Sequence, residues 1–423
     1  MGKEKLYNEN DKKDFAIVNF LRSCTNKEFS RVCISVEDIP KKSPFVANNL
    51  ISMYVEHGML AKARQILERI PIRNVVSWNA LIAGYARHGQ GQKALNCFGE
   101  MQRDGVSPNA ITLTCILKAC GNTSDVEKGK QIHDGIVSMG LLENDVVLGT
   151  ALVDMYAKCG FLQKAQEQHL QLLVRDVVSW NALIAIYARE RKVHEALISI
   201  GRMQCEGLSP DVITFTSALI ACSGAGAINK GKQVHNEIVI KNLLEQNMEL
   251  CNALVDMYTK CGALTKAKQV LLHELPARNV VTWNTLISGY AREGQGQEAL
   301  NCFEQMQREG IAPDAISLLC ILKVFSQTRL YEAQLYFKNM SGEYGITTNL
   351  EHFTSMVFSF GHAGHFDKAM SMIRTMPSSD YPPLWLALLS VCKRWGNVEL
   401  GRFAFDQLVQ LNNHFASAHV LNG

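Results

Sequence analysis

The chain has 423 residues, of which 47% are hydrophobic, and its formal net charge at pH 7 is +3. Because this charge is close to neutral, it excludes binding of nucleic acid through a general basic field, so any such contact must come from locally placed charges. No strongly apolar run is long enough to span a membrane. The 13 cysteines contain no Cys-x-x-Cys pair, which argues against a disulfide or zinc framework and predicts reduced cysteines in the core, in a reducing compartment.

The first 43 residues are the least regular part of the sequence. Residues 1–13 are polar, and residues 14–43 weakly match a helical hairpin. The segment carries nine Lys/Arg and seven Asp/Glu, whereas a mitochondrial or chloroplast transit peptide is poor in acidic residues. We therefore expect no transit peptide in this sequence.

From residue 44 onward the chain repeats itself. The stretch VVSWNALIAGYARHGQGQKALNCFGEMQRDGVSPN occupies residues 75–109, with a close copy at 280–314 and a looser copy at 177–211. Repetition of a stretch of about 35 residues is typical of solenoid proteins.

Each copy predicts two helices. In the copy at 75–109, apolar residues at helical spacing run from Trp78 to Tyr85, and a second apolar face runs from Ala94 to Met101. Gly105 then ends the second helix. One hairpin cannot cover its own apolar faces, so hairpins must stack on their neighbours. The sequence therefore predicts an all-α solenoid of helix-turn-helix repeats, with the tryptophans Trp78, Trp180 and Trp283 in its core.

The repeats divide the chain into three predicted segments. Residues 1–43 precede the array, the array covers residues 44–381, and residues 382–423 form a helical extension. Short, ordinary and long repeats alternate in that order within the array. The predicted repeats are 44–74, 75–109, 110–145, 146–176, 177–211, 212–247, 248–279, 280–314, 315–349 and 350–381.

The VVSWNALI-GYAR start, the period of about 35 residues and the alternation of lengths resemble the pentatricopeptide repeat family, in its plant PLS subclass. The stretch LWLALLSVCKRWGNVELG, which begins at Leu384, resembles the first "E" extension of that subclass, truncated here at Gly423. The resemblance implies binding of single-stranded RNA, one base per repeat, and a location in the mitochondrion or chloroplast.

In that family the fifth and the last residue of a repeat read one base. Here these base-reading residues are polar and able to hydrogen-bond. The implied pairs are Asn48 with Asn74, Asn79 with Asn109, Thr150 with Asp176, Asn181 with Asp211, Asn252 with Asn279, and Asn284 with Asp314, and the less dependable pairs of two long repeats are Thr114 with Asp145 and Thr216 with Asn247.

By the family's code these pairs predict the RNA sequence 5′-Y-Y-g-G-U-a-Y-U-3′, in which lower-case letters mark weak positions. Leu319 cannot hydrogen-bond, and Tyr381 stands where the last repeat usually carries an acid, so the 3′ end of the site is not read. An alternative is that Asn, Asp and Thr only cap helices and turns. Capping would explain the last residues of repeats, but not Asn79, Asn181 and Asn284 inside a helix.

Two further positions of the repeat match a strand-binding surface. In the family the second residues flank the base, and here they are Val76, Val147, Val178 and Val281, with Glu249 as an exception. The thirteenth residues are cations that could meet phosphate, namely Arg87, Lys158, Arg189, Lys260 and Arg292, or that simply end a solvated helix. If all five bind phosphate, the salt slope for a single strand is about −3.5, from roughly −0.7 per phosphate.

Enzymatic residues are incomplete in this sequence. A deaminase of this family needs His-x-Glu and a downstream Pro-Cys-x-x-Cys that holds zinc. The chain has His235-Asn236-Glu237 but no Cys-x-x-Cys, and His133 occupies the same helix position in an earlier long repeat. We therefore assign this triplet to repeat packing and predict no enzyme, no cofactor and no metal.

The resemblance implies an organellar RNA-editing specificity factor, which would act with a deaminase or another editing protein through the C-terminal extension. Two alternatives stay open. The protein could control RNA processing, stability or translation, or it could be a protein-binding helical scaffold, since related helical hairpins bind peptides.

Overall fold

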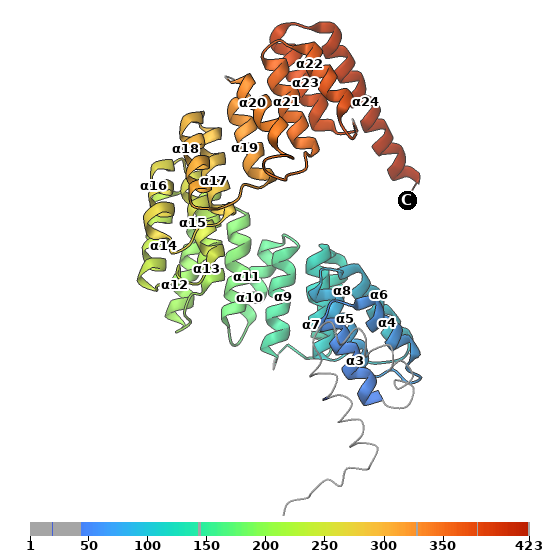
Figure 1. The fold of residues 1–423 in the computed structure, drawn as a ribbon. Helices are drawn as coiled ribbons and strands as arrows, with labels where there is room; N and C mark the ends of the chain where they lie inside the picture. The colour runs from blue at the N-terminus through green and yellow to red at the C-terminus, as the bar shows by residue number, and fades with distance from the viewer. Residues whose placement is uncertain (1–18, 20–43, 143–144, 327–328, 379, 422–423) are drawn as a thin grey trace, which may run out of the picture. The chain divides into compact units, whose positions relative to one another are not determined.

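The computed structural model describes residues 19, 44–142, 145–326, 329–378 and 380–421, and Figure 1 shows helices in successive pairs. The expectations for residues 1–43 lie outside the described residues, apart from residue 19. Contacts divide the chain into an N-terminal body, Met1–Ala221, and a C-terminal body, Cys222–Gly423. The all-α repeat fold predicted from the sequence is confirmed.

The N-terminal body stacks five hairpins. The first helix of each hairpin packs against the first helix of the next. Each second helix packs against its own first helix, and those of the first four hairpins also pack against the first helix of the next hairpin. The hairpins are α3 (Pro44–Glu56) with α4 (Leu60–Arg69), α5 (Val75–Arg87) with α6 (Gly91–Arg103), α7 (Ala110–Thr123) with α8 (Val126–Ser138), α9 (Val146–Lys158) with α10 (Leu162–Gln171), and α11 (Val177–Arg189) with α12 (Val193–Cys205). The division between the bodies falls inside the next helix, α13 (Val212–Ala225).

The C-terminal body continues the same pattern, because α15, α17, α19, α21 and α23 pack in succession. Its helices are α14 (Ile228–Ile240), α15 (Met248–Lys260), α16 (Leu264–Gln269) with the π-helical turn η3 (Val270–Glu274), α17 (Val280–Arg292), α18 (Gly296–Arg308), α19 (Ala315–Phe325), α20 (Leu330–Asn339), α21 (Leu350–His362), α22 (Phe366–Thr375), α23 (Pro382–Trp395) and α24 (Val398–Leu421). The repeat at 248–279 is one residue longer than those at 44–74 and 146–176. A π-helical turn takes up one extra residue, which accounts for η3.

The last residue of most repeats starts the next helix. Asn74, Asn109, Asp176, Asn279 and Asp314 each accept a hydrogen bond from the backbone N–H three residues later, while the hydroxyl of that residue accepts from the cap's own N–H. These are capping boxes, which satisfy donors that the first helical turn leaves open. Capping is therefore one role of these residues.

The core contains the three tryptophans, as predicted. Trp78, Trp180 and Trp283 are between 1% and 4% exposed. The described cysteines are free, and burial raises the pKa of the Cys97 thiol to about 11, which keeps it protonated. Most of them are buried or partly buried, whereas Cys205 is exposed.

Neighbouring hairpins match each other in side-chain size. A Cβ atom at Gly289 would lie 2.2 Å from Thr259 Cγ2 on the preceding short repeat, and one at Gly84 would lie 2.7 Å from both methyl carbons of Val55. The repeat at 177–211 has Ile186 at the same position, and there the preceding short repeat has Ala157 in place of the larger side chain. A large residue on one helix thus goes with a small residue on its neighbour.

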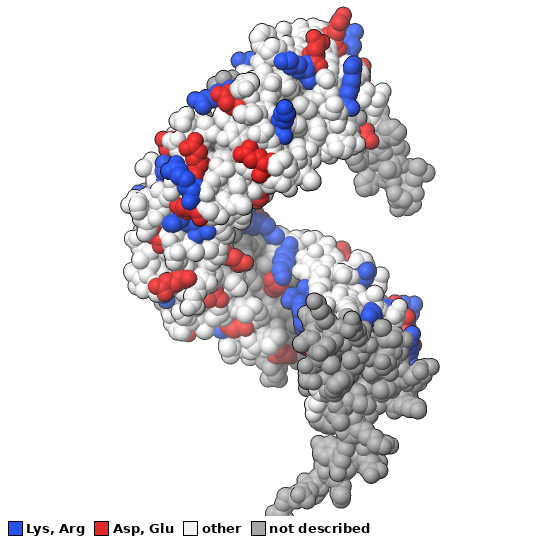
Figure 2. All heavy atoms as spheres, viewed as in Figure 1, with Lys and Arg blue, Asp and Glu red and all other residues white. Residues whose placement is uncertain are grey.

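Charges are mixed over the molecular surface. Lys and Arg lie among Asp and Glu, separated by uncharged surface, on the face seen in Figure 2. This distribution fits the near-neutral net charge. None of the described helices combines the length and apolar character needed to cross a membrane.

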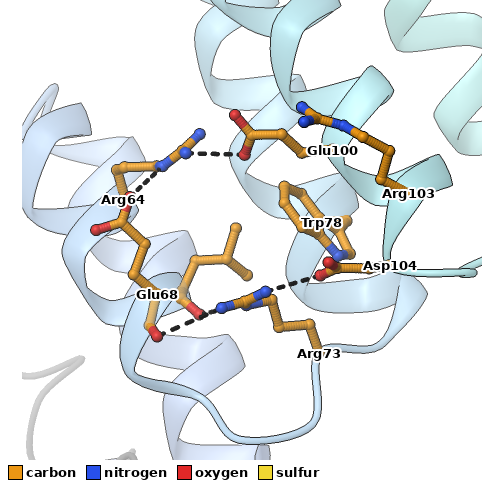
Figure 3. Close-up of a pocket in the computed structure, with 8 residues that line it drawn as sticks. Arg64, Glu68, Arg73, Trp78, Glu100, Arg103 and Asp104 are labelled. Atoms are coloured by element: carbon orange, nitrogen blue, oxygen red, sulfur yellow. Dashed lines mark hydrogen bonds and ion pairs between the residues drawn. The ribbon is translucent and has the colours of Figure 1, made fainter.

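An arginine joins each short repeat to the ordinary repeat that follows it. Figure 3 shows Arg73 beside Trp78, with its Nη1 atom 2.8 Å from Asp104 Oδ2. Its Nε donates to the carbonyl of Leu67 at the end of α4, at 3.1 Å. The same pairing recurs at 2.8 Å as Arg175 with Glu206 and Arg278 with Glu309. Each arginine therefore caps one hairpin and pairs with the next.

Candidate nucleic-acid interface

The two predicted base-reading residues of each ordinary repeat lie in direct contact. Asn181, on the second turn of α11, donates from Nδ2 to Asp211 Oδ1 at 3.0 Å. Asn79 donates in the same way to Asn109 at 3.0 Å, and Asn284 to Asp314 at 2.9 Å. The three asparagines are 6–8% exposed, so only a small edge of each amide is open to a ligand.

The third residue of the following long repeat completes each contact. The hydroxyl of Thr112 lies 2.6 Å from Asn79 Oδ1, that of Thr214 lies 2.6 Å from Asn181 Oδ1, and that of Ser317 lies 2.6 Å from Asn284 Oδ1. Each hydroxyl-bearing residue is fully buried. Sequence reasoning missed these three residues, although their position as the third residue after the cap could have indicated them.

The hydrogen bonds around Asp314 favour its charged form. Burial alone would raise the pKa of this carboxyl, but donation from the Ser317 backbone N–H and from the Asn284 amide lowers it below the ordinary value. Asp314 is thus ionised at neutral pH and acts only as an acceptor toward Asn284.

The predicted base-reading residues of the short repeats make fewer or longer hydrogen bonds to each other. Thr150 donates to Asp176 at 3.3 Å. Among the described residues, no hydrogen bond joins Asn48 to Asn74 or Asn252 to Asn279, and Asn252 Oδ1 is buried without a partner. The sequence predicts base reading for these pairs in the same way as for the pairs of the ordinary repeats.

The long-repeat pairs also lie apart from this pattern. Thr114 is half-buried on α7, and Asp145 caps α9 by accepting from the Leu148 N–H at 3.0 Å. Thr216 lies in the N-terminal body, whereas Asn247 lies in the C-terminal body, where its amide donates to the Leu243 carbonyl at 2.7 Å. Both last residues are thus held by local backbone.

An exposed aliphatic side chain stands on the first turn of most first helices. The predicted flanking residues Val76, Val147, Val178 and Val281 are 49–63% exposed. The long repeats place exposed aliphatic residues at the same position, which the sequence reading did not include: Ile111, Ile213 and Ile316, at 59–61% exposure. One exposed aliphatic side chain thus recurs at the same position of successive first helices.

The predicted phosphate-binding cations lie at the ends of first helices and are exposed. Arg189 donates to the carbonyl oxygens of Ala157 and Lys158, and Arg292 donates to that of Thr259 at 3.1 Å. These two therefore also cap the preceding first helix. Lys158 and Lys260 pair with Asp154 and Asp256 one turn earlier, at 2.7 and 2.8 Å, and Arg87 is exposed at the end of α5.

The histidine of the His-x-Glu triplet is a packing residue. His235 is buried, and its Nδ1 lies 2.9 Å from the Tyr258 hydroxyl. His133 and Tyr156 form the same contact at 2.9 Å in the earlier long repeat. In the part of the chain that the structure describes, no three His, Cys, Asp or Glu side chains gather closely enough to hold a metal ion.

Family models of known proteins match the hairpins. The PPR repeat family model matches residues 73–122, 175–224 and 278–327, and the PPR repeat model matches residues 45–75 and 351–381. The chain belongs to the pentatricopeptide repeat family.

Relatives in this family occur in Arabidopsis thaliana. One pentatricopeptide repeat-containing protein is 34% identical over 412 residues, covering 96% of this chain and 50% of that protein. A mitochondrial member is 36% identical over 378 residues, covering 89% of this chain and 59% of the relative. A second mitochondrial member is 30% identical and covers 90% of this chain and 68% of the relative. The chain thus spans 50–68% of the length of these three relatives.

A solved pentatricopeptide repeat structure shares the fold. The crystal structure of PPR10 in complex with an 18-nucleotide psaJ RNA element matches 94% of this chain and 59% of that chain, with a TM-score of 0.72 and 18% identity. At this identity the match establishes the architecture of stacked hairpins.

Proposed function

We propose that this protein binds single-stranded RNA in a sequence-specific manner, one base per repeat, and that it does so without catalysis. The observation that carries this proposal is that, in all three ordinary repeats, the fifth-residue asparagine donates to the last residue, an Asn or an Asp: Asn79–Asn109, Asn181–Asp211 and Asn284–Asp314. Membership in the pentatricopeptide repeat family and the RNA held by PPR10 support it.

The side chains suit an unstacked strand. Each amide retains one N–H and one oxygen lone pair beyond its contacts, and these can pair with the Watson–Crick edge of a base. Val76, Val178 and Val281 stand exposed three residues before the readers, where they can contact the base faces. Exposed cations at the helix ends supply charge for phosphate.

We further propose that the protein is a PLS-subclass editing specificity factor of an organelle. The sequence after residue 382 resembles the E extension, and two of the relatives are mitochondrial. In this role the repeats would position an editable cytidine, and the hairpin of α23 and α24 would contact a deaminase supplied by another protein. Control of RNA processing, stability or translation is the second candidate. Loss of the protein changes a base in the first case and transcript ends in the second.

Binding to a short RNA that contains YYGGUAYU tests the proposal. We would measure fluorescence anisotropy at two salt concentrations, and compare this RNA with one in which the U opposite repeat 177–211 is G. The variant Asn181→Thr, which keeps Asp211, recreates the Thr150–Asp176 pair and is expected to prefer G. The exposed Asn96→Thr on α6 makes the same chemical change away from the readers and should leave the preference for U unchanged.

Tight binding with a preference that changes from U to G in Asn181→Thr supports modular base reading. Absent binding, or binding that ignores the base, rejects it. If the protein instead binds peptides and is indifferent to Asn181 and Asp211, the scaffold function is the better description.

A further inference from the structure

We propose that Thr112, Thr214 and Ser317, the third residues of the long repeats, are positioning residues that fix the amide orientation of the base reader in the preceding ordinary repeat. This inference rests on the proposed RNA-binding function and goes beyond the fifth and last residues. In repeats 177–211 and 280–314, which end in Asp, it names a third, buried position that sets how sharply the repeat distinguishes uracil from cytosine.

The hydroxyl of Thr214 has one proton and two possible acceptors. The oxygen of Thr214 accepts from the Asp211 backbone N–H at 3.1 Å, and it lies 2.6 Å from Asn181 Oδ1 but 2.9 Å from Asp211 Oδ1. A buried hydroxyl must direct its single proton to an acceptor. The nearer oxygen belongs to the base reader, so Thr214 donates to Asn181.

The two partners of the Asn181 amide suit only one of its two orientations. Its Nδ2 donates to Asp211, and its Oδ1 accepts from Thr214, so each end of the amide has a partner that suits only one orientation. Turning the amide over would place its oxygen against an oxygen of Asp211, which has no proton to give when ionised. The network therefore assigns the orientation of Asn181.

Uracil and cytosine differ in the hydrogen-bonding groups on their Watson–Crick edges. Uracil presents an N3–H donor beside the O4 acceptor, whereas cytosine presents the N3 acceptor beside the N4–H donor. An amide that can turn over satisfies either base by exchanging its oxygen and its nitrogen. An amide of fixed orientation satisfies one of them and leaves polar groups of the other unpaired, which is costly. Holding the amide is thus a means of separating two bases of the same size.

The short repeats provide a natural contrast. The third residue of the ordinary repeat that follows each short repeat occupies the same kind of capping box, but its hydroxyl donates to a backbone carbonyl. These contacts join Ser77 to Asn74, Ser179 to Asp176 and Thr282 to Asn279, at 2.8–2.9 Å. Within the described residues, these hydroxyls make no hydrogen bond to Asn48, Thr150 or Asn252. Asn252 Oδ1, the group that a hydroxyl would hold, is buried without a partner. We therefore expect weaker discrimination in the short repeats.

The test compares Thr214→Val with Thr282→Val in the full chain. Both variants lose a buried hydroxyl of a capping box, but only the hydroxyl of Thr214 contacts the fifth residue of the preceding repeat, Asn181. The readout is the ratio of the Kd values for RNAs with C and with U opposite repeat 177–211. We expect Thr214→Val to lower the preference for U about 3- to 10-fold, as loss of one hydrogen bond implies. Thr282→Val should leave the preference for U unchanged. Thr214→Ser, which keeps a hydroxyl as at Ser317, should also retain this preference.

The outcomes separate this inference from the proposed function. A wild-type preference for U that survives in Thr214→Val overturns the positioning role and leaves RNA reading intact. A wild-type protein that binds no RNA, or binds it without base preference, rejects the proposed function, and the inference falls with it. If Thr214→Val does not fold, Ser317→Ala in the C-terminal body provides the same comparison opposite repeat 280–314.

Discussion

The indole N–H of Trp180 donates to the Glu206 carboxylate at 2.9 Å, whereas the indole N–H groups of Trp78 and Trp283, at the same place in the sister repeats, are buried without a partner among the described residues. At the position of Glu206 the first repeat has the shorter Asp104, which pairs with Arg73. The side chain of Glu309 in the third is occupied by Arg278 and Gln305. Length alone therefore does not decide, because Glu309 is as long as Glu206 but is held by Gln305. In the first repeat Glu100 stands at the position of Gln305 and pairs with Arg64 at 2.8 Å, so a glutamate at position 104 would have one oxygen for Arg73 and one for Trp78.

Asp104→Glu should therefore stabilise the N-terminal body. A buried donor without a partner costs about 1–3 kcal/mol, so we expect the free energy of unfolding to rise by about 1 kcal/mol when the longer carboxylate side chain reaches Trp78. Urea unfolding followed by circular dichroism measures it. In a Trp78→Phe background, which has no N–H to satisfy, the gain should vanish; an equal gain there would show that the indole is not the cause.

Gly289→Ala should destabilise the C-terminal body, although alanine is the better helix former. The added Cβ would lie 2.2 Å from Thr259 Cγ2, and such overpacking costs about 1–3 kcal/mol. Gly99, on α6, has open space around it, so Gly99→Ala should stabilise by up to about 1 kcal/mol. Adding Thr259→Ala to Gly289→Ala should recover stability, as in the natural pair of Ile186 and Ala157. A double variant as unstable as Gly289→Ala would contradict the size match.

His169 should make the N-terminal body sensitive to acid. Burial and then Arg175 lower the pKa of this histidine to about 4, and its Nε2 has no partner among the described residues. Because the unfolded chain binds the proton near pH 6.5, stability is full above that pH and is lost as the pH falls from about 6.5 toward 4.

The loss attributable to His169 is about 2 kcal/mol at pH 5. His169→Leu, which copies Leu67 of the first short repeat, should remove this part of the pH dependence. Thermal midpoints between pH 8 and pH 5 test it, and parallel wild-type and variant curves would argue against a role for His169.

Arg87→Gln and Lys260→Gln should each make the salt slope of RNA binding less steep by about 0.7, the value for one phosphate on a single strand. Arg189→Gln should do the same and also lower thermal stability, because its guanidinium caps the end of α9. Anisotropy titrations from low to high salt measure the slope. Arg103→Gln, an exposed change on α6, is the control; a similar effect there would mean that the cations act only through overall charge.

The sequence predicted the features that repetition makes visible. Each of the first helices α3 to α21 starts at the first residue of a predicted repeat, because hydrophobic spacing and cap residues recur together. The predicted readers Asn79, Asn181 and Asn284 stood out because each is a polar residue that recurs at the same position inside an apolar helix.

Other features could not be predicted, because they depend on contacts between repeats. The hydroxyls of Thr112 and Ser77 belong to the same capping position, and nothing in the local sequence shows that one donates to a reader and the other to a backbone carbonyl. The match of Gly289 with Thr259 likewise involves two helices that are apart in the sequence. The flanking Ile111 could have been found, since it occupies the same position as Val76.

The π-helical turn Val270–Glu274 lies where the repeat 248–279 has gained one residue. It places the additional residue of repeat 248–279 on the second helix of the hairpin, while α15 and α17 still pack as neighbours. A single-residue insertion is thereby absorbed outside the column of helices that carries Asn252 and Asn284. Under the proposed function, this insertion leaves the step from one nucleotide to the next unchanged, so the repeat can be one residue longer while its target sequence stays the same.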